Sequence, residues 1–129
     1  MTIELTMLLY SVLLAFAIML VPATDSILKN GVIPMMGNRD EGLAEPSVWN
    51  CRARRAAVNM AENLLWFAAL VLIAHAAGVS TPETVLGVQL FFWGRVVHAV
   101  TYIAGIAYVR TLAWAASIAG MGLIVLALV

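Results

Sequence analysis

Charged residues are scarce in this sequence. Only 11% of the 129 residues are charged and 64% are hydrophobic, whereas about a quarter of the residues in a soluble globular domain carry a charge. So large an apolar excess cannot be buried in a small soluble fold, because small domains have proportionally the most surface. The composition therefore excludes an ordinary cytosolic enzyme and a disordered chain, and it leaves a small integral membrane protein.

Cysteine and an excess of positive charge are lacking as well. The single cysteine, Cys51, permits no internal disulfide. Seven basic and seven acidic residues cancel, so there is no excess positive charge to hold phosphates, and we expect no nucleic-acid partner. No set of His, Cys and carboxylate residues has metal-ligand spacing, and we therefore expect no metal site.

Four apolar runs are present, and each is close to the roughly 20 helical residues that cross a bilayer core of about 30 Å. They predict an all-α, integral membrane four-helix bundle that forms a single transmembrane domain over residues 1–129. The helices are expected at about 5–22, 56–77, 84–109 and 111–129. Residues 26–55 are punctuated by glycine and proline and are predicted to form a long loop. The first run lacks a preceding Lys or Arg, which favours a retained helix over a cleaved signal peptide.

The basic residues outside the apolar runs mark one side of the predicted bundle. They occupy the long loop and the third connection, which share a side in a four-helix protein: Lys29, Arg39, Arg52, Arg54, Arg55 and Arg110. The opposite side carries Glu4 and Glu83 and no Lys or Arg. The positive-inside rule then places the long loop in the cytoplasm and both termini outside.

Polar side chains interrupt two of the apolar runs, although a charge within the bilayer costs at least about 2.5–3.5 kcal/mol on insertion scales. Each set follows helical spacing and shares one helix face: Asn59 and Glu62 in the second run with Arg55 directly before it, and Arg95, His98 and Tyr102 in the third run. Two such stripes facing each other across an antiparallel pair would bury the polar groups together. Counting the helical rise from the loop end brings Glu62 within reach of Arg95, and we predict an ion pair or a polar network between them.

The two stripes alone fit a polar ligand site and a structural network that links helices equally well. A small transporter is disfavoured, because the first helix carries no charge between Glu4 and Asp25. Arg52 and Arg54 are expected to anchor the chain at the interface. In the fourth run, small residues recur at a spacing that permits close approach to a neighbouring helix: Ala113, Ala116, Ser117 and Gly120.

Two segments resemble motifs of the MAPEG family, the membrane-associated proteins in eicosanoid and glutathione metabolism. Residues 55–62, RAAVNMAE, are similar to the family signature R-A-x-x-N-x-x-E, and residues 94–102, GRVVHAVTY, are similar to its third-helix motif. The resemblance covers nearly the whole chain. Residues 37–41, GNRDE, are more similar to the uncharacterised bacterial members than to the animal synthases.

This resemblance implies a homotrimer in the bacterial inner membrane that binds glutathione between subunits near the cytoplasmic face. Matching positions would contact the tripeptide or line its pocket: Arg55, Asn59, Glu62, Arg95, His98 and Tyr102. Arg110, at the end of the third helix, would stabilise the thiolate. The implied activity is a glutathione-dependent transferase or peroxidase acting on a lipophilic electrophile that enters from the lipid bilayer. The alternative is a non-catalytic membrane subunit whose polar network serves folding and assembly.

Overall fold

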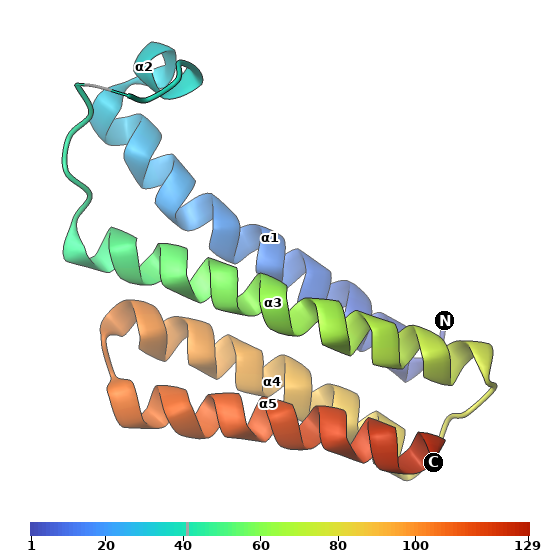
Figure 1. Cartoon of the computed structure of the whole chain (residues 1–129). Coiled ribbons are helices and arrows are strands. Elements are labelled where there is room, and N and C mark those ends of the chain that lie inside the picture. Colours follow the sequence, from blue (N-terminus) through green and yellow to red (C-terminus); the bar gives the residue numbers. More distant parts are fainter. Residues whose placement is uncertain (41) are drawn as a thin grey trace.

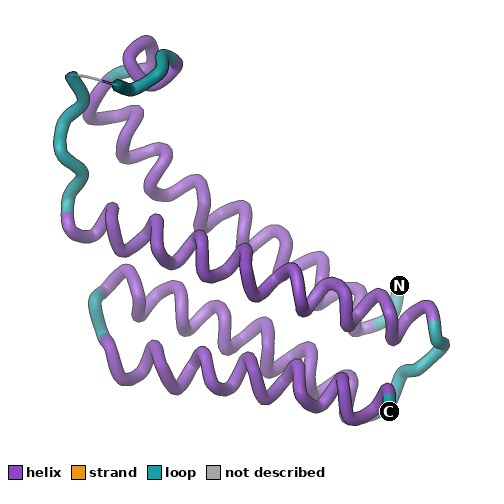
Figure 2. The backbone as a smooth tube through the Cα atoms, viewed as in Figure 1, coloured by secondary structure: helices purple, strands orange, loops and turns teal. Residues whose placement is uncertain are grey.

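The computed structural model describes residues 1–40 and 42–129, and these residues form five helices and no strand. The helices are α1 (Ile3–Asn30), α2 (Val32–Met36), α3 (Val48–Ala76), α4 (Pro82–Ala104) and α5 (Ala107–Leu128) (Figures 1 and 2). All but the short α2 are long and apolar enough to cross a membrane. The predicted all-α fold with four membrane spans is therefore confirmed. Glu41, part of the 37–41 motif, lies outside the described residues.

The four long helices run alternately in opposite directions (Figure 1). α2 and the turn between α4 and α5 lie at one end of the bundle, and both chain termini lie at the other (Figure 1). The predicted sharing of one end by the long loop and the last connection is thus confirmed. α4 packs most extensively against α5, while α3 packs against both α1 and α4.

The helix boundaries around the first loop differ from those predicted. α1 continues past residue 22 to Asn30, and α3 begins at Val48 rather than near residue 56. The Ser47 hydroxyl accepts a hydrogen bond from the backbone N–H of Asn50 at 3.3 Å and so caps α3. The predicted loop over 26–55 is shorter for this reason. Apolar runs mark the part of a helix that lipid covers, whereas the hydrogen-bonded helix extends beyond it.

The connection between the last two spans also differs. α4 ends at Ala104, not at 109, and Gly105 follows in the left-handed conformation with a φ of 83°. The backbone N–H of Ile106 donates to the carbonyl of Thr101 at 2.9 Å, which closes the helix end. Since α5 begins at Ala107, Arg110 lies in the first turn of α5 and not at the end of the third span.

Small residues bring α4 and α5 close together. A Cβ built on Gly120 would lie 2.5 Å from the carbonyl oxygen of Gly87, and one on Gly94 would lie 2.9 Å from that of Ala113. Ser117, also on this seam, is fully buried. The predicted close approach through the small residues of the fourth span is confirmed, with Ala116 only partly buried.

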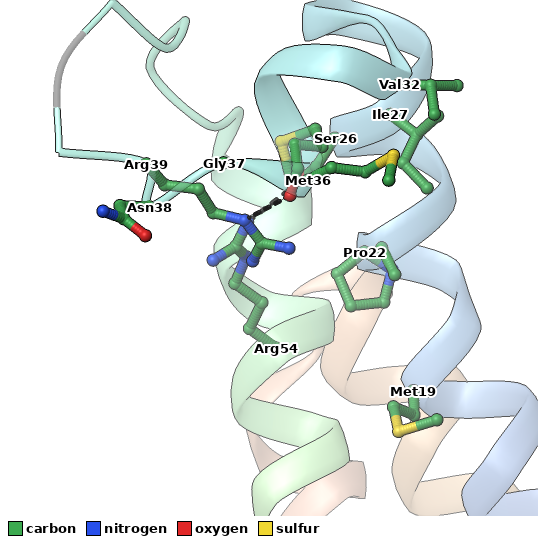
Figure 3. A pocket seen from close by; sticks show the side chains of 12 residues that line it. Met19, Pro22, Ser26, Ile27, Val32, Met36, Gly37, Asn38, Arg39 and Arg54 are labelled. Atoms are coloured by element: carbon green, nitrogen blue, oxygen red, sulfur yellow. Dashed lines mark hydrogen bonds between the residues drawn. The ribbon is translucent and has the colours of Figure 1, made fainter.

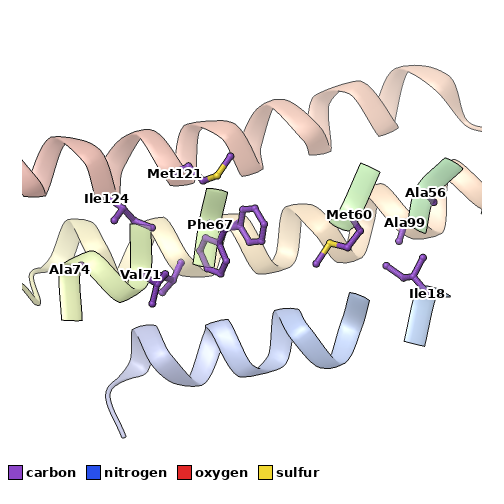
Figure 4. Close-up of a cluster of buried hydrophobic side chains, with 11 residues drawn as sticks. Ile18, Ala56, Met60, Phe67, Val71, Ala74, Ala99, Met121 and Ile124 are labelled. Atoms are coloured by element: carbon purple, nitrogen blue, oxygen red, sulfur yellow. The ribbon is translucent and has the colours of Figure 1, made fainter. Parts of the chain in front are cut away.

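The apolar core lies where α3 faces α4, and α1 and α5 contribute to it (Figure 4). Phe67 stacks on Phe91 with ring centroids 3.8 Å apart. Towards the end that carries the termini, the buried Glu4 carboxylate accepts hydrogen bonds from the hydroxyls of Ser80 (2.8 Å) and Thr84 (2.7 Å). This contact fastens the start of α1 to the start of α4.

Candidate functional site

Asn59 joins the polar faces of α3 and α4. Its side-chain oxygen accepts a hydrogen bond at 2.8 Å from Nη2 of Arg95, a residue only 1% exposed. Arg95 Nε also lies 3.4 Å from the sulfur of Met60, and Asn63 donates to the backbone carbonyl of Asn59 at 2.8 Å. Of the predicted α3 stripe, Asn59 therefore faces the α4 stripe, whereas Arg55 and Glu62 are exposed.

The predicted ion pair between Glu62 and Arg95 is wrong. Within residues 1–40 and 42–129, one ion pair is formed, between Lys29 and Asp25 at 3.3 Å. Glu62 is exposed on α3, and the partner of Arg95 is Asn59. The helical rise placed Glu62 at a reachable depth, but three residues along a helix of 3.6 residues per turn rotate a side chain by about 60° from the starting direction. Asn59 faces α4, and Glu62 does not.

A second cluster forms where α4 meets the first turn of α5. The rings of His98 and Tyr102 lie with centroids 5.4 Å apart. The guanidinium carbon of Arg110 lies 4.4 Å from the centroid of the Tyr102 ring, a cation–π contact. These three residues, with Asn59, Thr111 and Trp114, line a pocket of about 220 Å³.

A neighbouring pocket of about 360 Å³ opens on the other side of Asn59 and Tyr102, which line both pockets. Its remaining walls are Arg54, Arg55, Val58 and Glu62. Six of the seven residues predicted from the sequence thus line two pockets with shared walls. The seventh, Arg95, is buried behind them and holds Asn59.

Two buried nitrogen atoms at this site have no hydrogen-bond partner among the described residues: Nη1 of Arg95 and Nδ1 of His98. An unsatisfied buried donor typically costs about 1–3 kcal/mol, and more if charged. Such atoms accumulate at sites that hold a ligand or ordered water. The described residues hold no group of three or more His, Cys, Asp or Glu side chains that could bind a metal ion.

Arg54 lines the second of these pockets, although it was not predicted from the sequence as a site residue. Its Nε donates to the side-chain oxygen of Asn50 and its Nη2 to the hydroxyl of Ser26, both at 2.9 Å. Asn50 in turn donates to the carbonyl of Pro22 at 3.2 Å and to the carboxylate of Asp25 at 2.5 Å. Arg54 was expected to be an interfacial anchor, but it fastens α3 to α1 and lines a pocket. The sequence signal for this position is the Pro46-Ser47 pair. Serine is a favoured N-cap residue, so a helix start at Ser47 would have placed Asn50 and Arg54 within α3.

Four apolar helices with polar side chains held between them define a multi-pass integral membrane protein. Residues 5–129 match the sequence model of the MAPEG family. The chain therefore belongs to this family, as its two motifs indicated. No curated protein and no solved structure matches the chain.

Proposed function

We propose that the chain is a glutathione-dependent transferase that acts on lipophilic electrophiles. The observation that carries this proposal is the position of Arg110 over the Tyr102 ring, in a pocket that also contains Asn59 and His98. A guanidinium at the mouth of a small polar pocket favours a thiolate over a thiol. Membership of a family associated with glutathione supports glutathione as the thiol.

The adjoining pocket has the charges that suit the rest of the tripeptide. Glutathione carries two carboxylates and one ammonium group. Arg55 would bind a carboxylate through paired N–H groups, and Glu62 would bind the ammonium group. Asn59 and Tyr102 line both pockets, so a molecule spanning them would place its thiol near Arg110.

The chemical step is nucleophilic substitution by sulfur. The thiol loses its proton to solvent, and the thiolate attacks an electrophilic carbon. A carbon–sulfur bond forms while the leaving group departs with the electron pair of its bond. With a lipid hydroperoxide, the same thiolate would attack the terminal oxygen, so that an S–O bond forms while the O–O bond breaks and the lipid alkoxide takes up a proton and leaves as the alcohol. A second glutathione would then attack the sulfur of the resulting sulfenic acid, giving glutathione disulfide and water.

The exposed polar residues of α3 support self-association of the chain, and we propose a homotrimer. Arg55 and Glu62 are exposed on a helix that crosses the membrane. Charges facing lipid are costly, and such residues almost always face a bundle interior or a water-filled cavity. A second copy of the chain against this face would cover them and close the open side of both pockets.

Titration of the purified protein with glutathione tests the proposal. We expect saturable binding, together with an ultraviolet absorbance change that reports the thiolate. Arg55→Ala and Glu62→Ala should weaken binding by about tenfold or more, because each loses a charged hydrogen bond worth about 1.5–3 kcal/mol. Arg110→Ala should retain most of the binding and lose the thiolate signal.

Lys29→Gln is the matched control, since it removes a positive charge from the same end of the bundle without lining either pocket. It should bind glutathione as the parent protein does. If the folded protein shows no measurable glutathione binding, or if Arg55→Ala binds glutathione as tightly as the control, the proposal of a glutathione-dependent transferase is contradicted. The polar network would then serve folding and assembly of a non-catalytic subunit.

A further inference from the structure

A separate pocket of about 720 Å³ lies at the loop end of the bundle, enclosed by α1, α2, the start of the loop and α3 (Figure 3). None of the residues predicted from the sequence as site residues lines it. One wall is apolar and includes Met19, Ile27, Val32 and Met36. These side chains are between 40% and 80% exposed, so the pocket has an apolar entrance.

The opposite wall carries two arginines, Arg39 and Arg54. In Figure 3 their side chains extend toward one another, Arg39 from the loop and Arg54 from α3. Nε of Arg39 donates to the carbonyl oxygen of Met35 at 2.9 Å, and Arg54 is held by Asn50 and Ser26. Both arginines are thus fixed by neutral acceptors, and no acidic side chain among residues 1–40 and 42–129 forms an ion pair with either.

The backbone at Arg39 is in an unfavourable conformation. Its φ of 64° makes it the one non-glycine residue with positive φ in the described part of the chain. Side chains with a Cβ rarely adopt this region, and such strain gathers at sites that bind ligands. The conformation turns the Arg39 side chain back over α2, next to a second guanidinium of the same charge. Both side chains are exposed, and an anion between them would offset the repulsion between their like charges.

From this arrangement we propose that the pocket binds the headgroup of an anionic phospholipid. The phosphate lies between Arg39 and Arg54, because guanidinium groups bind phosphate through two parallel N–H groups. The acyl chains leave past Met19 and Ile27 along the apolar surface of α1. The pocket lies at the end of a membrane-spanning bundle, where the headgroups of the surrounding bilayer are found. The assignment does not depend on glutathione binding.

Native mass spectrometry of the full chain released from detergent micelles tests this site. The probes are phosphatidylglycerol and phosphatidylcholine with identical acyl chains, and inorganic phosphate as a free anion. We expect phosphatidylglycerol to bind about tenfold more tightly than phosphatidylcholine. Arg39→Gln and Arg54→Gln should each abolish this preference. Lys29→Gln should keep it, because Lys29 lies at the same end but does not line the pocket.

Arg39→Gln is the decisive variant, since Arg39 makes only one side-chain hydrogen bond among the described residues and its loss leaves the packing between α1 and α3 intact. Equal binding of the two lipids, or an unchanged preference in Arg39→Gln, would overturn the proposal. Displacement of the lipid by inorganic phosphate at the same concentration would also overturn it, because the site would then recognise a free anion and not a lipid.

Discussion

At the scale of single residues, the site depends on a buried cation whose main partner is neutral. The Arg95 side chain is almost completely buried, and it donates a hydrogen bond to the amide oxygen of Asn59 and not to a carboxylate. Burying a charge costs a large free energy unless hydrogen bonds offset it. Asn59 therefore has two roles, since it satisfies Arg95 on one side and lines both pockets on the other.

Replacing Asn59 alone should lower the stability of the protein more than replacing Asn59 and Arg95 together. In Asn59→Leu the Arg95 guanidinium loses its short hydrogen bond within the core, and we expect the free energy of unfolding to fall by about 2 kcal/mol. The double variant Asn59→Leu with Arg95→Met removes the buried charge as well and should recover part of this loss. Unfolding by denaturing detergent measures both values.

The cycle is completed by Arg95→Met alone. If the double variant is less stable than Asn59→Leu, the two residues do not depend on one another and the hydrogen bond contributes little.

The sequence pattern identified both residues but paired Arg95 with Glu62. Depth along a helix follows from the residue number, whereas the direction of a side chain depends on how the helix is rotated against its neighbour.

At the scale of the helices, the seam between α4 and α5 is the most extensive helix–helix contact among the described residues. Gly87 and Gly120 bring the two backbones together, because a Cβ on either glycine would lie within 2.6 Å of the other's carbonyl oxygen. Between membrane helices, such close packing replaces the hydrophobic effect as the source of stability. The sequence predicted this seam from small-residue spacing in the fourth span. It did not predict the partner glycines in α4.

Gly120→Ala should weaken this seam. The added methyl group would press on the backbone of α4, which cannot move as a side-chain end can, and overpacking of this kind typically costs about 1–3 kcal/mol. Gly122→Ala is the matched control in the same helix, because nothing lies within 4 Å of a Cβ built there. Thermal unfolding in detergent measures both variants.

In the control, stability should be unchanged or slightly raised, since alanine is the better helix former. Equal stability of Gly120→Ala and Gly122→Ala would show that α4 and α5 tolerate a wider spacing.

The helix ends were the least accurate part of the prediction from the sequence. Ser47 and Gly105 were the local signals for the start of α3 and the end of α4, but hydropathy alone obscures both.

At the scale of the whole molecule, the number of spans and the end shared by the long loop and the last turn were predictable. Both follow from apolar length and from alternation of direction, which are properties of one chain. The exposure of Arg55 and Glu62 was not predictable in the same way. It depends on how α3 is rotated against α4, which the spacing of residues along one helix does not determine.

The orientation in the membrane can be tested with single cysteines. In a Cys51→Ser background, Glu45→Cys places a thiol in the loop and Val129→Cys places one at the C-terminus, both at exposed positions. The positive-inside rule predicts that a membrane-impermeant thiol reagent labels residue 129 from outside the cell and residue 45 only after permeabilisation. The Cys51→Ser protein without a new cysteine supplies the background signal, and the reverse labelling pattern would invert the proposed topology.

Arg54 is a wall of two pockets, the polar one beside Tyr102 and the larger one beneath α2. One guanidinium cannot be optimally oriented toward two ligands at once. If the two proposed ligands bind, occupation of one pocket would therefore change the free energy of binding in the other. Linkage requires the effect to be reciprocal: the factor by which a lipid alters the affinity for a peptide thiol equals the factor by which the thiol alters the affinity for the lipid. A single side chain would thus make the affinity of this protein for its peptide thiol depend on the lipid composition of the surrounding membrane.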